Sequence, residues 1–130
     1  QRRIDELIVT LDMSEIADRR AEGFSQGEKM KVCLSRSLVH DPQNLIMDEP
    51  TNGLDVMTTR SVRSILHKLK KDNKCILLSS HIMQEISALC DEIIVIADGK
   101  VLMQGTLDEL ARRTNESDLE EAFMKITRQG

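Results

Sequence analysis

Apolar residues recur along the chain with two different spacings, which predict an alternation of helices and strands. Ile4, Leu7, Ile8 and Leu11 lie three and four residues apart, the spacing of one helical face. Helices are predicted over residues 4–13, 14–22, 82–90, 106–113 and 118–129. Short continuous apolar runs instead predict strands at residues 45–47 and 75–80, and a pair of strands within 92–105.

Capping and turn residues indicate where further elements begin and end. Ser25 is a good N-cap for a helix that Asp41-Pro42 ends, and Asp55 can cap another helix. Asp98-Gly99 is a strong signal for a β-hairpin. The apolar faces of these two capped helices and of the last helix are Met30, Cys33, Leu34 and Leu38; Val62, Ile65, Leu66 and Leu69; and Leu119, Ala122, Phe123 and Ile126.

The order of these elements predicts an α/β fold. Helix, strand, helix, strand, helix, hairpin and terminal helices together favour a mainly parallel sheet with flanking helices, plus a C-terminal β-hairpin and helices. The runs "LIM" and "CILL" are apolar at every position, as in strands buried on both faces of a parallel sheet. We therefore expect both strands to lie inside a layered structure.

Composition excludes several classes of protein. The 130 residues include 18 basic and 22 acidic side chains, a net charge of −4, so no concentrated basic face for nucleic acid is expected. No apolar run approaches the length needed to cross a bilayer, and no signal peptide is visible. Cys33, Cys75 and Cys90 stand singly in apolar patterns, which predicts reduced core residues of a cytosolic protein.

Polar residues of chemical interest cluster after the two predicted parallel strands. Asp48 and Glu49 close the first strand and His81 follows the second, so adjacent strands would bring His81 towards the two carboxylates. Ser25 and Gly27 open a helix whose N-terminal amides could meet an anion. Each feature also has an ordinary interpretation: a loop start, a solvated loop histidine and an N-cap.

Taken in order, "FSQGE", "LIMDEP", "NGLD" and "LLSSH" resemble the ATP-binding-cassette (ABC) ATPases from their signature motif onwards. The resemblance is close from about Gly23 to Gln104. The terminal "LEEAFMKIT" is similar to the tail of cassette ATPases that drive sodium, drug and polysaccharide exporters. The resemblance implies a partial P-loop NTPase fold and the use of ATP and Mg²⁺.

The resemblance also implies a role for each motif residue. Asp48 corresponds to the Walker B aspartate that holds Mg²⁺, Glu49 to the catalytic carboxylate that polarises the attacking water, and His81 to the switch histidine that donates to the γ-phosphate. The signature loop implies contacts to an ATP held by the partner subunit from Ser25, Gln26, Gly27 and Glu28. Asn52, Gly53, Leu54 and Asp55 would form the D-loop across the dimer interface, with Asp55 also among the ATP-binding residues.

The signature segment departs from the family pattern at two positions. The usual motif is Leu-Ser-Gly-Gly-Gln, whereas this chain has Phe24-Ser25-Gln26-Gly27-Glu28. Gln26 adds a side chain where the family usually has none. Glu28 places an acid in the first turn of the helix, which is locally favourable but should weaken the attraction of a phosphate to that helix end.

The chain contains no G-x-x-x-x-G-K-[ST] run, the phosphate-binding loop of this family, and few aromatic residues to stack adenine. We therefore interpret residues 1–130 as the C-terminal portion of one nucleotide-binding domain, inactive alone. Residues 1–40 are then the end of the helical subdomain, 41–104 the Walker B, D-loop and H-loop core, and 105–130 the C-terminal helices.

Three functions remain open at this point. The first is the ATP-hydrolysing subunit of an ABC transporter, which would pair with a second nucleotide-binding subunit and a transmembrane permease at the cytoplasmic face of the membrane. The second is a cassette ATPase that does not transport, such as a translation factor or a chromosome-structure protein. The third is a truncated, non-catalytic binding module.

Overall fold

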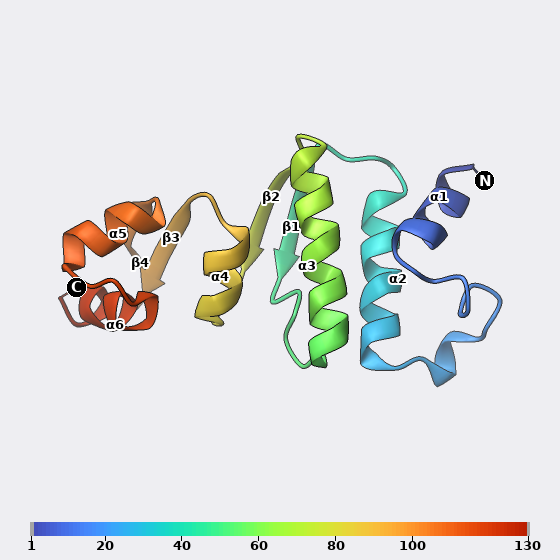
Figure 1. Cartoon of the computed structure of the whole chain (residues 1–130), viewed down its shortest axis with the longest axis horizontal. Coiled ribbons are helices and arrows are strands. Elements are labelled where there is room, and N and C mark those ends of the chain that lie inside the picture. Colours follow the sequence, from blue (N-terminus) through green and yellow to red (C-terminus); the bar gives the residue numbers. More distant parts are fainter. Residues whose placement is uncertain (1, 130) are drawn as a thin grey trace. The chain divides into compact units, whose positions relative to one another are not determined.

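The computed structural model describes residues 2–129, which form two compact units, one up to Ser80 and one from His81 (Figure 1). The elements of the first unit are α1 (Arg2–Thr10), the short 3₁₀ helix η1 (Ala21–Gly23), α2 (Gln26–Leu38), β1 (Asn44–Asp48), α3 (Val56–Lys71) and β2 (Cys75–Ser79). Those of the second are α4 (Met83–Leu89), β3 (Ile93–Ala97), β4 (Lys100–Gly105), α5 (Leu107–Thr114) and α6 (Leu119–Gln129).

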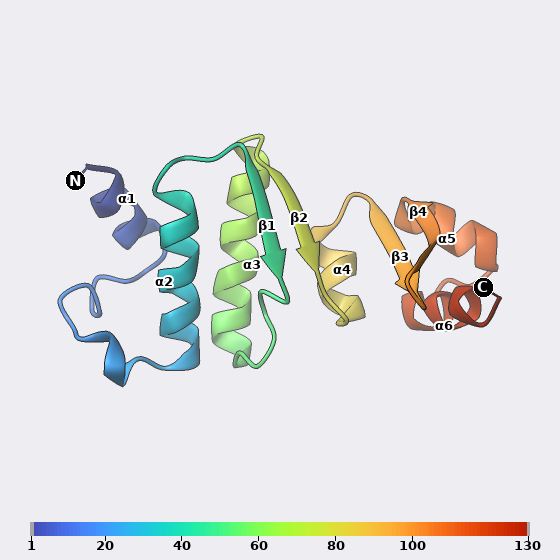
Figure 2. The same cartoon turned by 180° about the vertical axis from the view of Figure 1, so that it is seen from behind.

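Strands β1 and β2 pair in parallel, and α3 is the crossover that connects them. The predicted stripe of α3 is buried, with exposed fractions between 0% and 8%. Helix α3 covers one face of the two strands, as Figures 1 and 2 show from opposite sides. Leu45 and Met47 of β1 are buried. The predicted β-helix-β unit is thus confirmed, in a sheet of two strands.

The opposite face of this sheet is exposed, contrary to the expectation that both strands are buried on both faces. Ile46 and Leu77 are register partners on that face and are 83% and 58% exposed. The reason is geometrical: side chains alternate between the two faces of a strand, and α3 covers only one of them. An apolar residue indicates that a position suits burial, but it does not supply the element that covers it.

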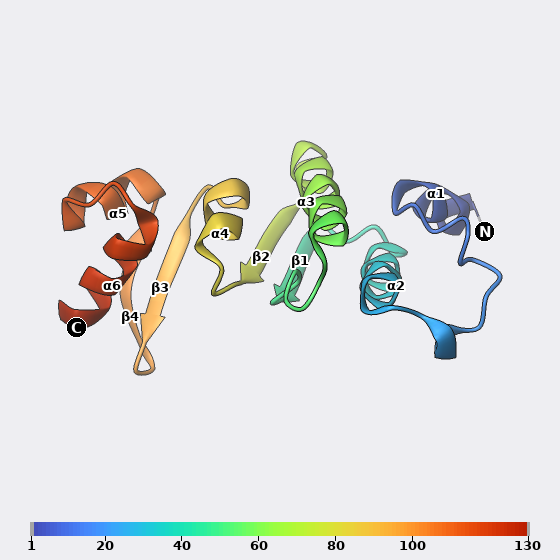
Figure 3. The same ribbon diagram turned by 60° about the horizontal axis from the view of Figure 1, so that its bottom comes forward.

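Helices α1 and α2 are neighbours in the N-terminal segment, and a turn segment with η1 connects them (Figure 3). The buried hydrophobic side chains of this region form a small apolar core: Leu7, Leu11, Met13, Ile16, Leu34 and Leu38. The predicted helix over 14–22 is wrong: residues 14–19 form turns, and only η1 follows. Met13 and Ile16 pack inward, joined by a hydrogen bond from Ile16 N to Met13 O of 3.0 Å, whereas the polar residues of this segment lie at the surface.

The second unit is built on the predicted hairpin. Asp98 and Gly99 both have positive φ, 49° and 73°, as in the type I′ turn that suits the twist of paired strands. One face of the hairpin packs against α5 and α6, and the core residues are Val95, Met103, Leu110, Ala122 and Ile126. The predicted apolar face of the last helix is confirmed, with Leu119 and Phe123 partly buried beside this core.

The cysteines are not core residues, contrary to the sequence-based expectation. Cys33 and Cys75 are exposed and Cys90 is half-buried, and none of the three forms a disulfide bond. Cys33 lies beside Leu34 on the helix, and the burial of α2 is centred on Leu34 and Leu38 rather than on the cysteine. Within residues 2–129, no helix combines the length and apolar character needed to span a bilayer.

Candidate functional site

The carboxyl ends of β1 and β2 bring a serine hydroxyl to the acidic pair. Asp48 and Ser79 are register partners, and Ser79 Oγ donates a hydrogen bond of 2.5 Å to Asp48 Oδ1. Ser79 Oγ in turn accepts a 2.9 Å hydrogen bond from the backbone N–H of Glu49. Ser79 therefore fixes both the Asp48 carboxylate and the start of the turn that follows it.

Glu49 occupies a backbone conformation that side chains rarely adopt. Its φ is 47°, in the left-handed region, which costs a non-glycine residue roughly 1–2 kcal/mol. The chain reverses at this point in a turn closed by a hydrogen bond of 3.1 Å from Asn52 N to Glu49 O. The two residues within the turn, Pro50 and Thr51, are buried. Such outliers gather at functional sites, where the rest of the fold holds them in place. The abrupt turn after the acidic pair is therefore a feature of the candidate site.

The loop from Glu49 ends at the N-cap of α3. Asp55 Oδ1 accepts from the backbone N–H groups of Met57 and Thr58 at 2.9 and 3.0 Å, and Thr58 Oγ1 donates to Asp55 Oδ2 at 2.6 Å. The hydrogen bond from the Thr58 hydroxyl, with the backbone N–H bonds, lowers the pKa of the Asp55 carboxyl. The N-cap predicted from the sequence is confirmed.

This cap makes a pH-dependent contribution to stability. Because the folded state lowers the pKa of Asp55, the contribution is complete above the ordinary aspartate pKa near 3.8 and is lost as the pH falls through the lower folded value. We expect Asp55→Asn, which keeps an acceptor but cannot titrate, to flatten the pH dependence of the free energy of unfolding below about pH 4. Chemical denaturation from pH 2 to 6 measures this, and an unchanged slope in the variant would contradict the assignment.

A capping box orders the start of α2. Ser25 Oγ accepts from the backbone N–H of Glu28 at 3.2 Å, and Glu28 Oε2 accepts from the backbone N–H of Ser25 at 2.6 Å. The hydrogen bond from the Ser25 N–H is the main cause that lowers the pKa of the Glu28 carboxyl. The predicted N-cap at Ser25 is confirmed, and Glu28 is the second member of the capping box.

The first turns of α2 and α3 are in direct contact. A Cβ built on Gly27 would lie 2.7 Å from Thr58 Cγ2 and 2.8 Å from Thr58 Oγ1, so a larger residue has no room there. Gly27 is buried by this contact. Since Thr58 also binds Asp55, one threonine side chain joins the segment beginning at Ser25 to the segment ending at Asp55. The structure thus brings together two of the predicted site segments.

The other predicted residues have the following positions. Gln26 begins α2 and is exposed, and Gly53 has a positive φ of 71° in the loop before Asp55. His81 is exposed and belongs to the second unit, so its approach to Asp48 and Glu49 stays a prediction. Within residues 2–129, no three His, Cys, Asp or Glu side chains form a group that could hold a metal ion.

Sequence reasoning gave no role to Ser79 or Thr58. The contact of Ser79 with Asp48 depends on the register of two strands 31 residues apart, which no local pattern reports. A polar residue at the end of a buried strand, next to a strand that ends in acids, is the signal that could have indicated it. Thr58 is visible only as the residue three positions after a helix cap.

Comparisons with known proteins give a consistent result. Residues 1–52 match the family model described as ABC transporter. The chain is 42% identical over 122 residues to the ABC transporter ATP-binding protein NatA of Bacillus subtilis (strain 168), covering 94% of this chain and 50% of that protein. It is 37% identical over 114 residues to the bacitracin transport ATP-binding protein BcrA of Bacillus licheniformis, covering 87% and 37%.

Solved structures agree with the sequence relatives. An ATP-binding subunit of an ABC transporter superimposes with a TM-score of 0.85 at 28% identity, over 97% of this chain and 53% of that one. CbiO1 from Clostridium perfringens, described as part of the ABC transporter complex cbiONQ, gives a TM-score of 0.71 at 26% identity, over 95% and 52%. The α/β fold is therefore that of ABC ATP-binding subunits.

These comparisons relate the chain to the ATP-binding proteins of ABC transporters. The chain spans about half the length of NatA and less of BcrA.

Proposed function

We propose that the intact protein is the ATP-binding and ATP-hydrolysing subunit of an ABC transporter. The observation that carries the proposal is the arrangement at the end of β1. Asp48 is fixed by Ser79, and Glu49 follows it in a strained turn that leads directly to the cap of α3. The relatives NatA and BcrA are named as transporter and transport ATP-binding proteins, which favours transport over the other uses of a cassette ATPase.

The two carboxylates differ in their surroundings, which supports different roles. Asp48 accepts the Ser79 hydroxyl, so its carboxylate is held at the strand end as an oxygen donor. In proteins, Mg²⁺ is usually bound by one or two carboxylates, with phosphate oxygens and water as its other ligands. A single fixed carboxylate therefore suits this ion. Asp48 would hold the ion, and Mg²⁺ bound there would neutralise charge on the phosphate oxygens.

Glu49 is the residue that would act on water. It would accept a hydrogen bond from a water molecule aligned with the γ-phosphorus, while its turned backbone keeps the carboxylate at the start of the loop. Phosphoryl transfer depends on alignment and charge stabilisation more than on covalent help from the protein, so a fixed carboxylate is sufficient for this role. His81 would donate a hydrogen bond to the γ-phosphate.

The segments at the starts of α2 and α3 would contact ATP held by a second nucleotide-binding subunit. Ser25 and Gly27 open a helix whose N-terminal N–H groups favour an anion. Asp55 lies beside them through the Thr58 contact, so both segments would meet the partner as one surface. A transmembrane permease would complete the transporter and hold this subunit at the membrane.

ATP turnover and association with membrane proteins test the proposal. The intact protein should hydrolyse ATP only when Mg²⁺ is present, and it should be recovered from solubilised membranes with a membrane-spanning protein in stoichiometric amount. Recovery with ribosomes or chromosomal DNA would favour a non-transport ATPase. Absence of Mg²⁺-dependent turnover in the intact protein would favour a non-catalytic binding module.

A further inference from the structure

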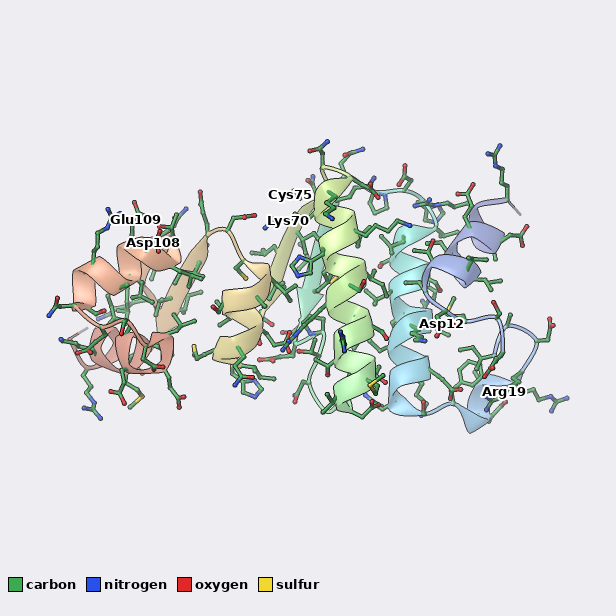
Figure 4. All side chains as sticks on the ribbon, viewed as in Figure 1. Asp12, Arg19, Lys70, Cys75, Asp108 and Glu109 are labelled. Atoms are coloured by element: carbon green, nitrogen blue, oxygen red, sulfur yellow. The ribbon has the colours of Figure 1, made fainter. Side chains whose placement is uncertain are left out.

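The turn segment that precedes α2 contributes an arginine to the start of this helix. Arg19 Nη1 donates to Glu28 Oε1 at 2.9 Å, and the Arg19 guanidinium lies 5.5 Å from the centroid of the Phe24 ring. Nη2 also reaches the carbonyl oxygen of Gly23, at 3.5 Å. Figure 4 labels Arg19 in the segment that leads into α2. One guanidinium thus contacts residues at both ends of the segment Phe24–Glu28, which includes the first turn of α2.

The ion pair changes the electrostatics of this helix end. A bare carboxylate at position 28 would oppose a phosphate, because both are anions competing for the positive end of α2. Here the two oxygens of Glu28 bind the Ser25 N–H and Arg19, so its negative charge has an adjacent positive charge. The expectation that Glu28 weakens phosphate binding therefore applies to the carboxylate without Arg19.

We propose that Arg19 is a positioning residue for nucleotide binding. The Phe24 ring lies against the guanidinium beside Glu28, and the guanidinium cancels the charge of Glu28, so that the start of α2 accepts the triphosphate of an ATP bound to the second subunit. This inference rests on the proposed function.

The effect should appear in nucleotide affinity rather than in folding. Arg19 is 49% exposed and Glu28 is 25% exposed, and ion pairs at such positions contribute little to stability because water screens them. A triphosphate brought against the same segment excludes part of that water, so an uncompensated Glu28 would repel it more strongly. If Arg19 had a purely structural role, its loss would lower the free energy of unfolding and leave nucleotide affinity nearly unchanged.

The test uses the intact ATPase with Arg19→Ala, Glu28→Gln, the double variant and Arg20→Ala. We expect Arg19→Ala to raise the KM for Mg-ATP about three- to tenfold, which is the effect on binding of one charge near a helix terminus. The kcat should change less than about twofold. Arg19→Lys should recover most of the loss because it keeps the charge. Arg20→Ala removes an equal charge from the neighbouring exposed residue and should leave KM near the parent value.

The double variant separates charge compensation from other roles. In the Glu28→Gln background, Arg19→Ala should raise KM less than about twofold, because no carboxylate remains to be cancelled. An equal rise in KM in both backgrounds, or a parent-like KM for Arg19→Ala, would overturn this proposal. The proposed function would still stand in either case, provided that the parent protein hydrolyses ATP. A parent protein without ATP turnover would overturn both. Arg19→Gln gives the same comparison if the alanine variant does not fold.

Discussion

Glu49→Gln in the intact protein should reduce ATP turnover by roughly 10²–10⁴-fold, the range for loss of a general base, while Mg-ATP binding is retained. Glutamine has the same shape, and its backbone can keep the turn that Glu49 makes at φ 47°. What it loses is the charge that polarises water. Single-turnover hydrolysis and equilibrium nucleotide binding, measured on the same preparation, separate these two effects.

Asp48→Asn is the matched comparison, since it removes one charge from the adjacent residue. Its oxygen can still accept from Ser79, but it is a poorer ligand for Mg²⁺, so the Mg²⁺ concentration required for half-maximal turnover should rise. The two variants should therefore differ in their Mg²⁺ dependence. Turnover by Glu49→Gln at the parent rate would show that another group activates the water.

Gly27→Ala should lower ATP turnover by roughly 10- to 100-fold, although the change adds a single methyl group. The added Cβ would lie 2.7 Å from Thr58 Cγ2, so Thr58 must move, and its hydrogen bond to Asp55 moves with it. Overpacking of this kind costs about 1–3 kcal/mol of folding free energy. Steady-state turnover and chemical denaturation measure the two consequences.

Thr58→Ala provides the control for this clash. It removes Cγ2 and Oγ1, the two nearest atoms, and leaves Thr58 Cβ at 3.2 Å. Adding Gly27→Ala in that background should therefore cost much less than in the parent. If the Gly27→Ala penalty is the same in both backgrounds, the contact between the two helix starts does not explain it.

Local signals in the sequence predicted most of the helices and their caps. Ser25 and Asp55 are N-caps because their side chains reach N–H groups two or three residues along the chain. Asp98-Gly99 forms the hairpin for a similarly local reason, the tolerance of both residues for positive φ. Predictions of this kind need only neighbouring residues, and these were confirmed.

Predictions that depended on distant parts of the chain were less successful. The polar segment 14–22 lacks enough apolar positions to hold a helix on the core, and tertiary packing of Met13 and Ile16 sets its turns instead. Burial of Ile46 and Leu77 depends on what covers the second sheet face. The roles assigned to Asp48, Glu49 and His81 came from resemblance and stay predictions, whereas Ser79 and Arg19 emerged only from contacts in three dimensions.

The pairing of Asp48 with Ser79 also limits how the length of the chain can vary. Side chains alternate between faces, so one inserted or deleted residue that shifts β2 against β1 would place Leu78 or Ser80 opposite Asp48 and turn the serine to the other face. A one-residue insertion within α3 would in addition rotate its stripe by about 100°. Insertions within β1, α3 or β2 should therefore not be tolerated, because each would break the register that places Ser79 beside Asp48.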